Sequence, residues 1–270
     1  MLRLNQFQFE TVREIGRGGL GVVSEIVVTA TNGSHEVGTR LAMKKLNDRW
    51  ASNTTALTRF EREIQALKSM NHGSILQIRG ENLAGFERFY CMDLYKGSLR
   101  DWIAGATMAP SIAEVAAHFH SIADALDHAH SCGHYHRDIK PENILHTNGN
   151  APVVADWGLG YFVHRNSMVL VQLTRGGMGT EYYCSAEQWA TGKCGPAGDV
   201  YSLGMTMAEV LTGQQNPIAD IGDGITYDVL HPSTQAAITM NQLIRKMTCR
   251  DSRQRIQNMS QVRSVLATLR

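Results

Sequence analysis

The stretch HAHSCGHYHRDIKPEN, residues 128–143, decides which kind of fold and chemistry this chain has. Four histidines and Cys132 fall within residues 128–136, which is a composition that could indicate a metal site. However, His128 and His130 are two residues apart on a predicted helix, so their side chains do not face each other. Gly133 is expected to end that helix before His134. The histidines are therefore expected to be mostly incidental.

The same stretch carries Asp138, Lys140 and Asn143, and Asp156 follows eighteen residues after Asp138 at the end of an apolar run. Phosphoryl transfer to a hydroxyl needs a carboxylate to orient the nucleophile and accept its proton. It also needs a cation at the transferring phosphoryl group and oxygen ligands for Mg²⁺. These four residues match that list, so they indicate a phosphoryl-transfer site with a catalytic loop.

Upstream, the segment IGRGGLGVV (residues 15–23) has the spacing G-x-G-x-x-G-x-V, with glycines at 16, 18 and 21. Glycines at these positions let a backbone approach phosphate oxygens closely. A dinucleotide-binding turn has a similar pattern, but it needs a helix directly after the glycines. The residues that follow here look like a strand, which favours a hairpin over phosphates.

Lys44 lies in LAMKK (residues 41–45), on the next predicted strand. A lysine on a strand is most often a solvated edge residue. Glu63 lies in the amphipathic helix predicted over residues 54–70, where an ion pair with Lys44 could direct the ammonium group toward a nucleotide. The sequence alone leaves this pairing open.

The secondary-structure pattern predicts an α+β protein with two lobes. The first ninety-odd residues read mostly as strands, interrupted by the helix at 54–70, and the Asn32-Gly33 pair is a hairpin signal. After Gly97 the pattern becomes helical, and Ser111 with Glu114 forms a possible capping box. The predicted organisation is a β-rich N-lobe over residues 1–93, a hinge over 93–97 and a helical C-lobe over 98–270, with a ligand cleft between the lobes.

Taken in order, these motifs resemble a eukaryotic-type (Hanks-type) serine/threonine protein kinase domain from about residue 9 to the C-terminus. The bilobal fold agrees with that family. The motifs that carry the resemblance are the glycine loop, AMK, the helix glutamate, HRDIKPEN, DWG (156–158), SAE (185–187) and DVYSLG (199–204). In the family, Asp199 would brace the catalytic loop, and Arg255 would pair with Glu187.

The resemblance implies a role for each matching residue, with ATP as the phosphate donor and Mg²⁺ as its metal. Asp138 would be the catalytic base and Lys140 would meet the γ-phosphate, while Lys44, paired with Glu63, would bind the α- and β-phosphates. Mg²⁺ would be held by Asn143 and Asp156. The expected nucleotide-binding residues are Gly16, Gly18, Gly21, Val23, Ala42, Lys44, Met92, Asp93, Tyr95 and Leu145.

Lysine at position 140 and threonine at position 180 are the forms that serine/threonine kinases carry, so protein serine and threonine hydroxyls are the expected acceptors. Two other functions remain as alternatives. One is an ATP-binding pseudokinase scaffold, which the intact Lys44, Asp138, Asn143 and Asp156 disfavour. The other is a small-molecule phosphotransferase, which the peptide-docking segment GTEYYCSAE (179–187) disfavours.

The chain departs from the family pattern at three places: Trp157 replaces the usual phenylalanine, Ala186 replaces the usual proline, and the loop at residues 31–39 is longer than usual. We expect Trp157 either to bias the domain toward its metal-competent state or simply to fill the same apolar slot. Arg137 belongs to the type of arginine that binds a phosphorylated activation segment. Ser167 and Thr174 are the candidate autophosphorylation sites.

Bulk composition adds limits on partners and location. A net charge of +1, from 26 basic and 25 acidic residues, gives no overall attraction to nucleic acid. The five cysteines are scattered and odd in number, which is typical of reduced thiols in the cytoplasm. No apolar run is long enough to predict a membrane span or a secretory signal. Protein substrates are the expected partners, and the oligomeric state is not predicted.

Overall fold

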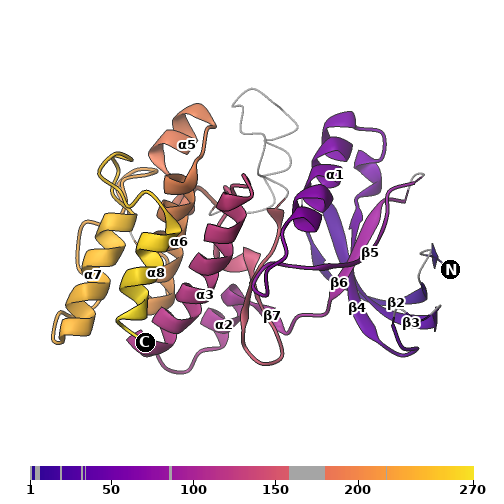
Figure 1. The fold of residues 1–270 in the computed structure, drawn as a ribbon, viewed down its shortest axis with the longest axis horizontal. Helices are drawn as coiled ribbons and strands as arrows, with labels where there is room; N and C mark the ends of the chain where they lie inside the picture. Colours follow the sequence, from indigo (N-terminus) through magenta and orange to yellow (C-terminus); the bar gives the residue numbers. More distant parts are fainter. Residues whose placement is uncertain are drawn as a thin grey trace.

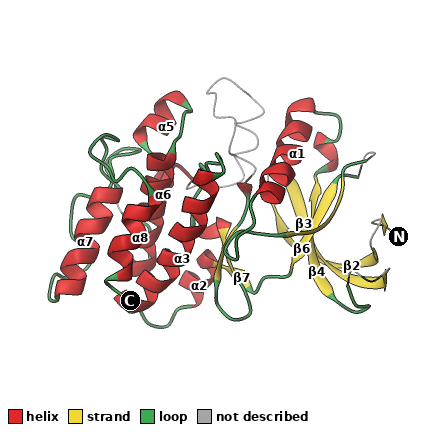
Figure 2. Ribbon diagram, in the orientation of Figure 1, coloured by secondary structure: helices red, strands yellow, loops and turns green. Residues whose placement is uncertain are grey.

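The computed structural model describes most of the chain, namely residues 2–3, 7–18, 20–31, 33, 35–84, 87–157, 180–216 and 218–270. Figure 2 shows that strands gather at one end of the molecule and helices at the other. This arrangement confirms the predicted α+β, bilobal fold. The predictions for Ser167, Thr174, Asn32 and the side chain of Thr180 fall outside what the structure describes.

The described N-terminal residues form a six-stranded antiparallel sheet with the order β1-β2-β3-β4-β6-β5 (Figure 1). Its strands are β1 (Leu2–Arg3), β2 (Phe7–Arg17), β3 (Gly21–Thr31), β4 (Arg40–Leu46), β5 (Ile78–Asn82) and β6 (Phe89–Asp93). Side chains alternate between the two faces of a strand. On β4, Leu41 and Met43 therefore pack into a small core on one face, while Ala42 and Leu46 join the main core on the other.

Helix α1 (Thr54–Ser69) lies beside this sheet, as Figure 1 shows. The side chain of Asn53 accepts a hydrogen bond from the backbone N–H of Ala56 over 2.9 Å, which caps the helix. Phe60, Ile64 and Leu67 are buried at spacings of three and four, so the predicted amphipathic face is confirmed. The same spacing places Glu63 on the buried side of the helix.

Helices make up most of the C-terminal part. They are α2 (Leu99–Gly105), α3 (Ile112–Ser131), α5 (Ala186–Thr191), α6 (Pro196–Thr212), α7 (Gln235–Met247) and α8 (Met259–Ala267). Ser111 and Glu114 form the predicted capping box of α3. Gly213 ends α6 in the left-handed conformation, with φ of 73°. Helix α2 begins behind a second capping box, made by Ser98 and Asp101.

Short elements connect these helices and support the candidate site. They are the 3₁₀ helices η1 (Asp48–Trp50), η2 (Pro141–Asn143) and η4 (Thr180–Tyr183), and the strands β7 (Gly97–Ser98), β8 (Ile144–His146) and β9 (Pro152–Val154). The last three pair in the order β7-β8-β9. The apolar run at residues 88–94 contains β6, whereas β5 begins only at Ile78. Ile75 instead forms an isolated parallel bridge with Val154 of β9.

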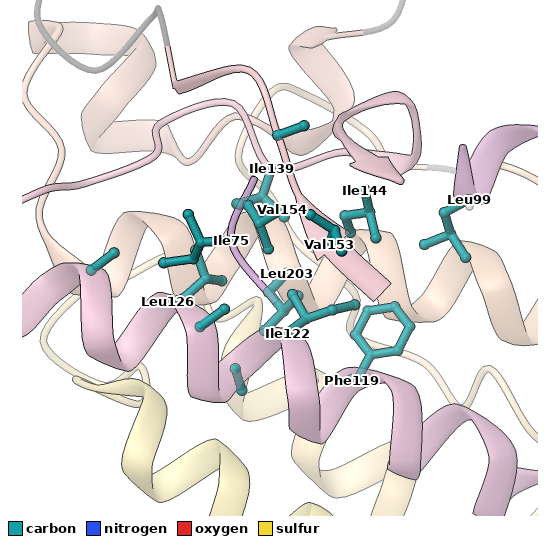
Figure 3. Close-up of a cluster of buried hydrophobic side chains, with 14 of the residues drawn as sticks. Ile75, Leu99, Phe119, Ile122, Leu126, Ile139, Ile144, Val153, Val154 and Leu203 are labelled. Carbon is teal, nitrogen blue, oxygen red and sulfur yellow. The ribbon is translucent and has the colours of Figure 1, made fainter. Parts of the chain in front are cut away.

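The main core lies directly beneath residues 138–143 (Figure 3). Ile139, within this stretch, and Ile144, directly after it, are both fully buried. They join apolar side chains from α3, from β9 and from Leu203 of α6. The apolar residues of the loop are anchored in the core. They therefore fix which of its polar side chains point away from the core. Within the described part of the chain, none of the helices is both long and apolar enough to span a bilayer.

Candidate active site

Lys44 lies where the sheet, helix α1 and the C-terminal part of the chain meet. On β4 it is opposite Val23 of β3 and Tyr90 of β6. Its Nζ lies 2.7 Å from Oε1 of Glu63 and 2.9 Å from Oδ1 of Asp156. The pairing of Lys44 with Glu63, which the sequence left open, is therefore confirmed, and Asp156 is added to it.

The charges around Lys44 keep it protonated. Burial alone would lower the pKa of Lys44, but the carboxylates of Asp156 and Glu63 outweigh it and raise that pKa well above its ordinary value. The ammonium charge in turn holds the pKa of Asp156 below its ordinary value. Tyr90 donates a hydrogen bond over 2.9 Å to Oε1 of Glu63 and so fixes the carboxylate from behind.

Asp138 is held in place by groups from its own loop. Its carboxylate Oδ2 lies 2.9 Å from Nζ of Lys140 and accepts a hydrogen bond of 2.9 Å from Nδ2 of Asn143. Nδ2 of Asn143 also donates to the backbone carbonyl of Asp138 over 2.7 Å. The other oxygen, Oδ1, is buried and has no hydrogen-bond partner among the described residues. Burial raises the pKa of Asp138, although the positive charge of Lys140 opposes this.

His136 is buried and connects the catalytic loop to the start of the Asp156 segment. Its Nε2 lies 2.9 Å from the carbonyl oxygen of Ala155, and its Nδ1 lies 3.3 Å from the backbone N–H of Asp138. These partners require a proton on Nε2 and a lone pair on Nδ1. The imidazole therefore sets the spacing between the backbones that carry Asp138 and Asp156.

Asp199, at the start of α6, holds the loop from below. It accepts hydrogen bonds from the backbone N–H groups of His136 and Arg137 over 2.8 and 2.7 Å. Arg137 has φ of 66°, a strained conformation for a residue with a side chain. The third partner of Asp199 is Nε2 of His130, at 2.8 Å. The prediction that this histidine is incidental is therefore wrong, because His130 hydrogen-bonds the carboxylate that orients the loop.

Histidines 128 and 134 have smaller roles. The ring of His128 stacks on that of His72 with centroids 5.5 Å apart, and Nε2 of His134 lies 2.9 Å from Oγ of Ser69. Within the described residues, no three or more His, Cys, Asp or Glu side chains gather in a way that could hold a metal ion.

The glycine motif forms the turn between β2 and β3. The backbone N–H of Gly18 donates over 2.8 Å to the carbonyl of Gly21, and Gly16 is paired with Val23. A Cβ atom on Gly21 would lie 2.6 Å from the carbonyl oxygen of Lys45 on β4. Gly21 is thus required by close strand packing, a reason that the motif itself does not reveal.

The residues expected around adenine lie on both sides of the connection between the sheet and α2. Ala42 is opposite Met92 in the β4–β6 pair, and both belong to the main core, against which Val23, Tyr95 and Leu145 also pack. The side chain of Asp93 is engaged elsewhere, because it forms two hydrogen bonds of 2.8 and 2.7 Å with Arg79. Only the backbone of Asp93 is therefore left for contact with a base.

Trp157 is buried directly after Asp156. Its indole Nε1 donates to the carbonyl oxygen of Val154 over 3.3 Å, and its ring packs edge-on against His136 with centroids 4.6 Å apart. The extra N–H that tryptophan has over phenylalanine is thus used, in a long hydrogen bond. Asp156 itself has φ of 61°, so the contacts of Trp157 fix a strained backbone.

The predicted pair of Arg255 and Glu187 is also confirmed. Two guanidinium nitrogens of Arg255 lie 2.6 and 3.1 Å from the two carboxylate oxygens of Glu187. Ala186, which replaces the usual proline, packs against Gly222, where a Cβ would lie 2.4 Å from the backbone nitrogen of Ala186. The segment at residues 185–187 thus retains Glu187 for its ion pair, and the loop that carries Gly222 packs against it.

A cavity of about 530 Å³ lies between α1 and the catalytic loop. Arg59, Arg62 and Arg137 line it, together with Ser69 and other residues. Arg59 is 3% exposed, and its Nε and Nη2 have no hydrogen-bond partner among the described residues. The three guanidinium groups of the lining suit an anion, and Glu63 is an acidic residue beside them.

Known proteins share this sequence pattern. The chain is 32% identical over 191 residues to serine/threonine-protein kinase PknL of Mycobacterium tuberculosis, covering 70% of this chain and 47% of that protein. It is 27% identical over 272 residues to the probable serine/threonine-protein kinase PknB of Lactococcus lactis, covering 97% and 42%. For serine/threonine-protein kinase PknA of Mycobacterium tuberculosis the identity is 30% over 222 residues, covering 80% and 49%.

The chain thus spans less than half the length of these curated relatives. The family model described as protein kinase domain matches residues 9–266, which is nearly the whole chain. The matched region contains every residue of the site built above. The chain therefore belongs to the protein kinase domain family, which confirms the resemblance predicted from its motifs.

Proposed function

We propose that the chain transfers the γ-phosphate of ATP to serine and threonine hydroxyls of proteins. The observation that carries the proposal is the contact of Lys44 with both Glu63 and Asp156, at 2.7 and 2.9 Å. These three residues come from a strand, a helix and a distant loop. Phosphoryl transfer in kinases depends on having the corresponding lysine, glutamate and aspartate in place together.

In the proposed reaction, Asp138 orients the acceptor hydroxyl and takes its proton on Oδ1, the oxygen without a described partner. Its raised pKa suits this role, because a base works best when its pKa approaches the working pH. Lys140, 2.9 Å from Asp138, supplies a positive charge at the position where the transferring phosphoryl would pass. No covalent intermediate with the protein is needed.

The nucleotide would be held by the residues that the sequence analysis named. Lys44 would bind the α- and β-phosphates beneath the turn formed by Gly16, Gly18 and Gly21. The apolar side chains of Val23, Ala42, Met92 and Leu145 would enclose the adenine, and backbone groups from Asp93 to Tyr95 would hydrogen-bond it.

Asn143 and Asp156 fit a magnesium ion by their chemistry. Mg²⁺ prefers oxygen ligands and usually takes few of them from the protein. Asn143 uses its amide nitrogen on Asp138, which turns its amide oxygen away from that carboxylate, and the side chain of Asp156 is about half exposed. The ion would neutralise charge on the phosphates, while Asn143 and Asp156 fix its position relative to Asp138.

We also propose autophosphorylation, at Ser167 or Thr174. The support is the arginine-lined cavity, since guanidinium groups pair well with phosphate. A cytoplasmic location is proposed because ATP is available there and all five cysteines have free thiols. The balanced net charge of +1 supports protein partners over nucleic acid.

The test is incubation with γ-labelled ATP and Mg²⁺, alone and with both a basic and an acidic generic protein, followed by identification of the labelled amino acids. Label on serine or threonine of the chain or of either protein supports the proposal. Bound ATP without any transfer would instead favour the pseudokinase scaffold. Label found only on added small alcohols would favour the small-molecule phosphotransferase.

A further inference from the structure

Tyr90 of β6 is a buried residue whose hydroxyl reaches the candidate active site. Its side chain is 1% exposed, and its ring packs against Phe60 of α1 with centroids 5.7 Å apart. A buried tyrosine hydroxyl usually has a hydrogen-bond partner. The partner here is Oε1 of Glu63, at 2.9 Å. Tyr90 therefore contacts α1 at two residues one turn apart, Phe60 by packing and Glu63 by a hydrogen bond.

The direction of this hydrogen bond follows from the charges around it. Burial and the negative charge of Glu63 raise the pKa of Tyr90 well above its ordinary value, so the hydroxyl keeps its proton. The hydroxyl of Tyr90 therefore donates and the carboxylate of Glu63 accepts. A hydrogen bond to a charged group contributes more than one between neutral groups.

Tyr90 and Lys44 form a cross-strand pair. They lie directly opposite each other in the β4–β6 register, so both side chains are on the same face of the sheet. Nζ of Lys44 lies 5.9 Å from the centre of the Tyr90 ring and 2.7 Å from Oε1 of Glu63. One carboxylate oxygen on α1 thus receives two donors from neighbouring strands.

The other oxygen of Glu63, Oε2, is buried and has no hydrogen-bond partner among the described residues. Burial raises the pKa of Glu63 and the charge of Asp156 adds to this, whereas Lys44 and the hydrogen bond from Tyr90 oppose it. Without the Tyr90 hydroxyl, Lys44 would be the one donor to the Glu63 carboxylate that the described part of the chain supplies. The carboxylate would then be less firmly held.

Lys44 has a second carboxylate within reach, because its Nζ also lies 2.9 Å from Oδ1 of Asp156. The side chain of Glu63 is completely buried, while that of Asp156 is 47% exposed. A Glu63 that turned away would leave Lys44 with Asp156 as its counter-charge and move the ammonium group off its present position. An anchored Glu63 therefore keeps the lysine in place.

We propose that Tyr90 is a positioning residue for phosphoryl transfer: its hydroxyl anchors Glu63 of α1 to the sheet and thereby holds Lys44 at the phosphates of the nucleotide. The inference rests on the proposed kinase function and deepens it, because kinases depend on this lysine–glutamate contact and on the placement of the helix that carries the glutamate. Tyr90 takes no part in the transfer step itself.

The test is Tyr90→Phe, which removes the hydroxyl and keeps the ring beside Phe60. Steady-state kinetics are measured with ATP and a generic acceptor protein, on phosphatase-treated wild type and variant. We expect kcat/KM for ATP to fall about tenfold, as for the loss of one hydrogen bond to a charged group, while KM for the acceptor protein changes by less than about twofold. A merely structural role would change both.

The effect must pass through Glu63. In a Glu63→Gln background the ion pair with Lys44 is already lost, so adding Tyr90→Phe should lower kcat/KM for ATP by less than about twofold. Tyr227→Phe is the matched control, because it removes a hydroxyl that donates to Asn216 over 3.2 Å in the partly exposed loop between α6 and α7. Its kcat/KM should equal that of the wild type, and urea unfolding checks that each variant is folded.

The inference is overturned if folded Tyr90→Phe keeps kcat/KM for ATP within about threefold of the wild type, or loses equally with and without Glu63→Gln. It is also overturned if KM for the acceptor changes as much as kcat/KM for ATP. Should Tyr90→Phe fail to fold, Tyr90→Met, which fills the same space with an adaptable apolar side chain, is judged by the same criteria.

Calorimetric titration with ATP separates this inference from the kinase function. A wild type that binds ATP but transfers no phosphate to any protein contradicts the kinase function alone. The role of Tyr90 is then judged by ATP affinity: a fall of at least about threefold in Tyr90→Phe that the Glu63→Gln background abolishes supports it, and any other result overturns it.

Discussion

Nε2 of His130 lies 2.8 Å from Oδ2 of Asp199, and both side chains are almost completely buried. The pair connects α3 to α6 beneath the catalytic loop. Asp199 also accepts hydrogen bonds from the backbone N–H groups of His136 and Arg137 and a longer one from the thiol of Cys194, so the histidine is one of four described donors to this carboxylate. The orientation of the loop that carries Asp138 thus depends on a residue eight positions upstream of it.

We expect His130→Ala to lower the free energy of unfolding by about 1.5–3 kcal/mol, the usual range for a hydrogen bond to a charged group. The turnover number should fall more than the affinity for ATP, because the loop and not the nucleotide site is disturbed. Urea unfolding and steady-state kinetics measure both. His128→Ala, on the same helix but partly exposed, is the matched control and should have a smaller effect on each.

The pair also predicts a pH dependence of stability. Burial by itself would raise the pKa of Asp199, but the hydrogen bond and charge of His130, with further help from the backbone N–H of Arg137, hold it below its ordinary value of 3.8. A carboxylate with a lowered folded-state pKa contributes stability that is fully present above the unfolded-state pKa and is lost as pH falls through the folded-state pKa. Acid unfolding of His130→Ala should therefore begin at a higher pH than that of the wild type. Coincident acid transitions would contradict this role of His130.

Gly224 and Gly213 offer a test of backbone packing. Both have a positive φ, of 74° and 73°, but a Cβ on Gly224 would lie 1.8 Å from the carbonyl oxygen of Thr248, whereas nothing lies within 4 Å of one on Gly213. Gly213→Ala should lower the free energy of unfolding by about 1–2 kcal/mol, because of the left-handed conformation alone. Gly224→Ala should lower the free energy of unfolding by more than about 4 kcal/mol, because a clash with the backbone is added. Equal costs in urea unfolding would show that the loop moves freely away from Thr248.

Trp157→Phe tests whether the indole N–H biases the segment that carries Asp156. The carbonyl of Val154 keeps a second donor, the backbone N–H of Leu76 at 3.0 Å, so the substitution leaves no buried acceptor unpaired. We expect the substitution to weaken this bias by about 1 kcal/mol, which corresponds to roughly a fivefold shift in a two-state equilibrium. Activity of the unphosphorylated enzyme should fall by a similar factor. If activity and its dependence on phosphorylation both stay the same, Trp157 only fills an apolar slot.

Lys44→Met and Glu63→Gln should each lower kcat/KM for ATP by at least about a hundredfold, because each breaks the same buried contact. The double variant should be little worse than the more damaged single variant, since residues that act as a unit are not additive. Lys45→Met is the control on the same strand, because Lys45 pairs on the surface with Glu87 at 2.8 Å. Fully additive losses would show that Lys44 and Glu63 act separately.

Local sequence patterns were enough to predict several features. The spacing of Phe60, Ile64 and Leu67 predicted α1, and the Ser111 and Glu114 pair predicted the start of α3. These signals depend on neighbours within a few residues. The order of the kinase motifs then predicted that Lys44 would meet Glu63, which the structure bears out.

The features that the sequence did not reveal depend on contacts between distant positions. Nothing in the residues next to His130 indicates that its side chain contacts Asp199, 69 positions away. In the sequence, the four histidines of residues 128–136 look equivalent to one another. Arg100 reads as an ordinary helix residue until Glu142 and Glu209 are brought to it. The clash that requires Gly21 to be glycine comes from β4 and not from its own turn. Such pairings are set by tertiary packing, which a periodic pattern does not record.

The role of Asp138 is the central claim, and Asp138→Asn tests it most directly. ATP binding should be measured by calorimetry and phosphoryl transfer by single-turnover kinetics, on the wild type and the variant side by side. We expect unchanged ATP affinity and a rate of transfer lowered by about 10²–10⁴-fold, the usual contribution of a general base. Transfer by Asp138→Asn at the wild-type rate would contradict the account.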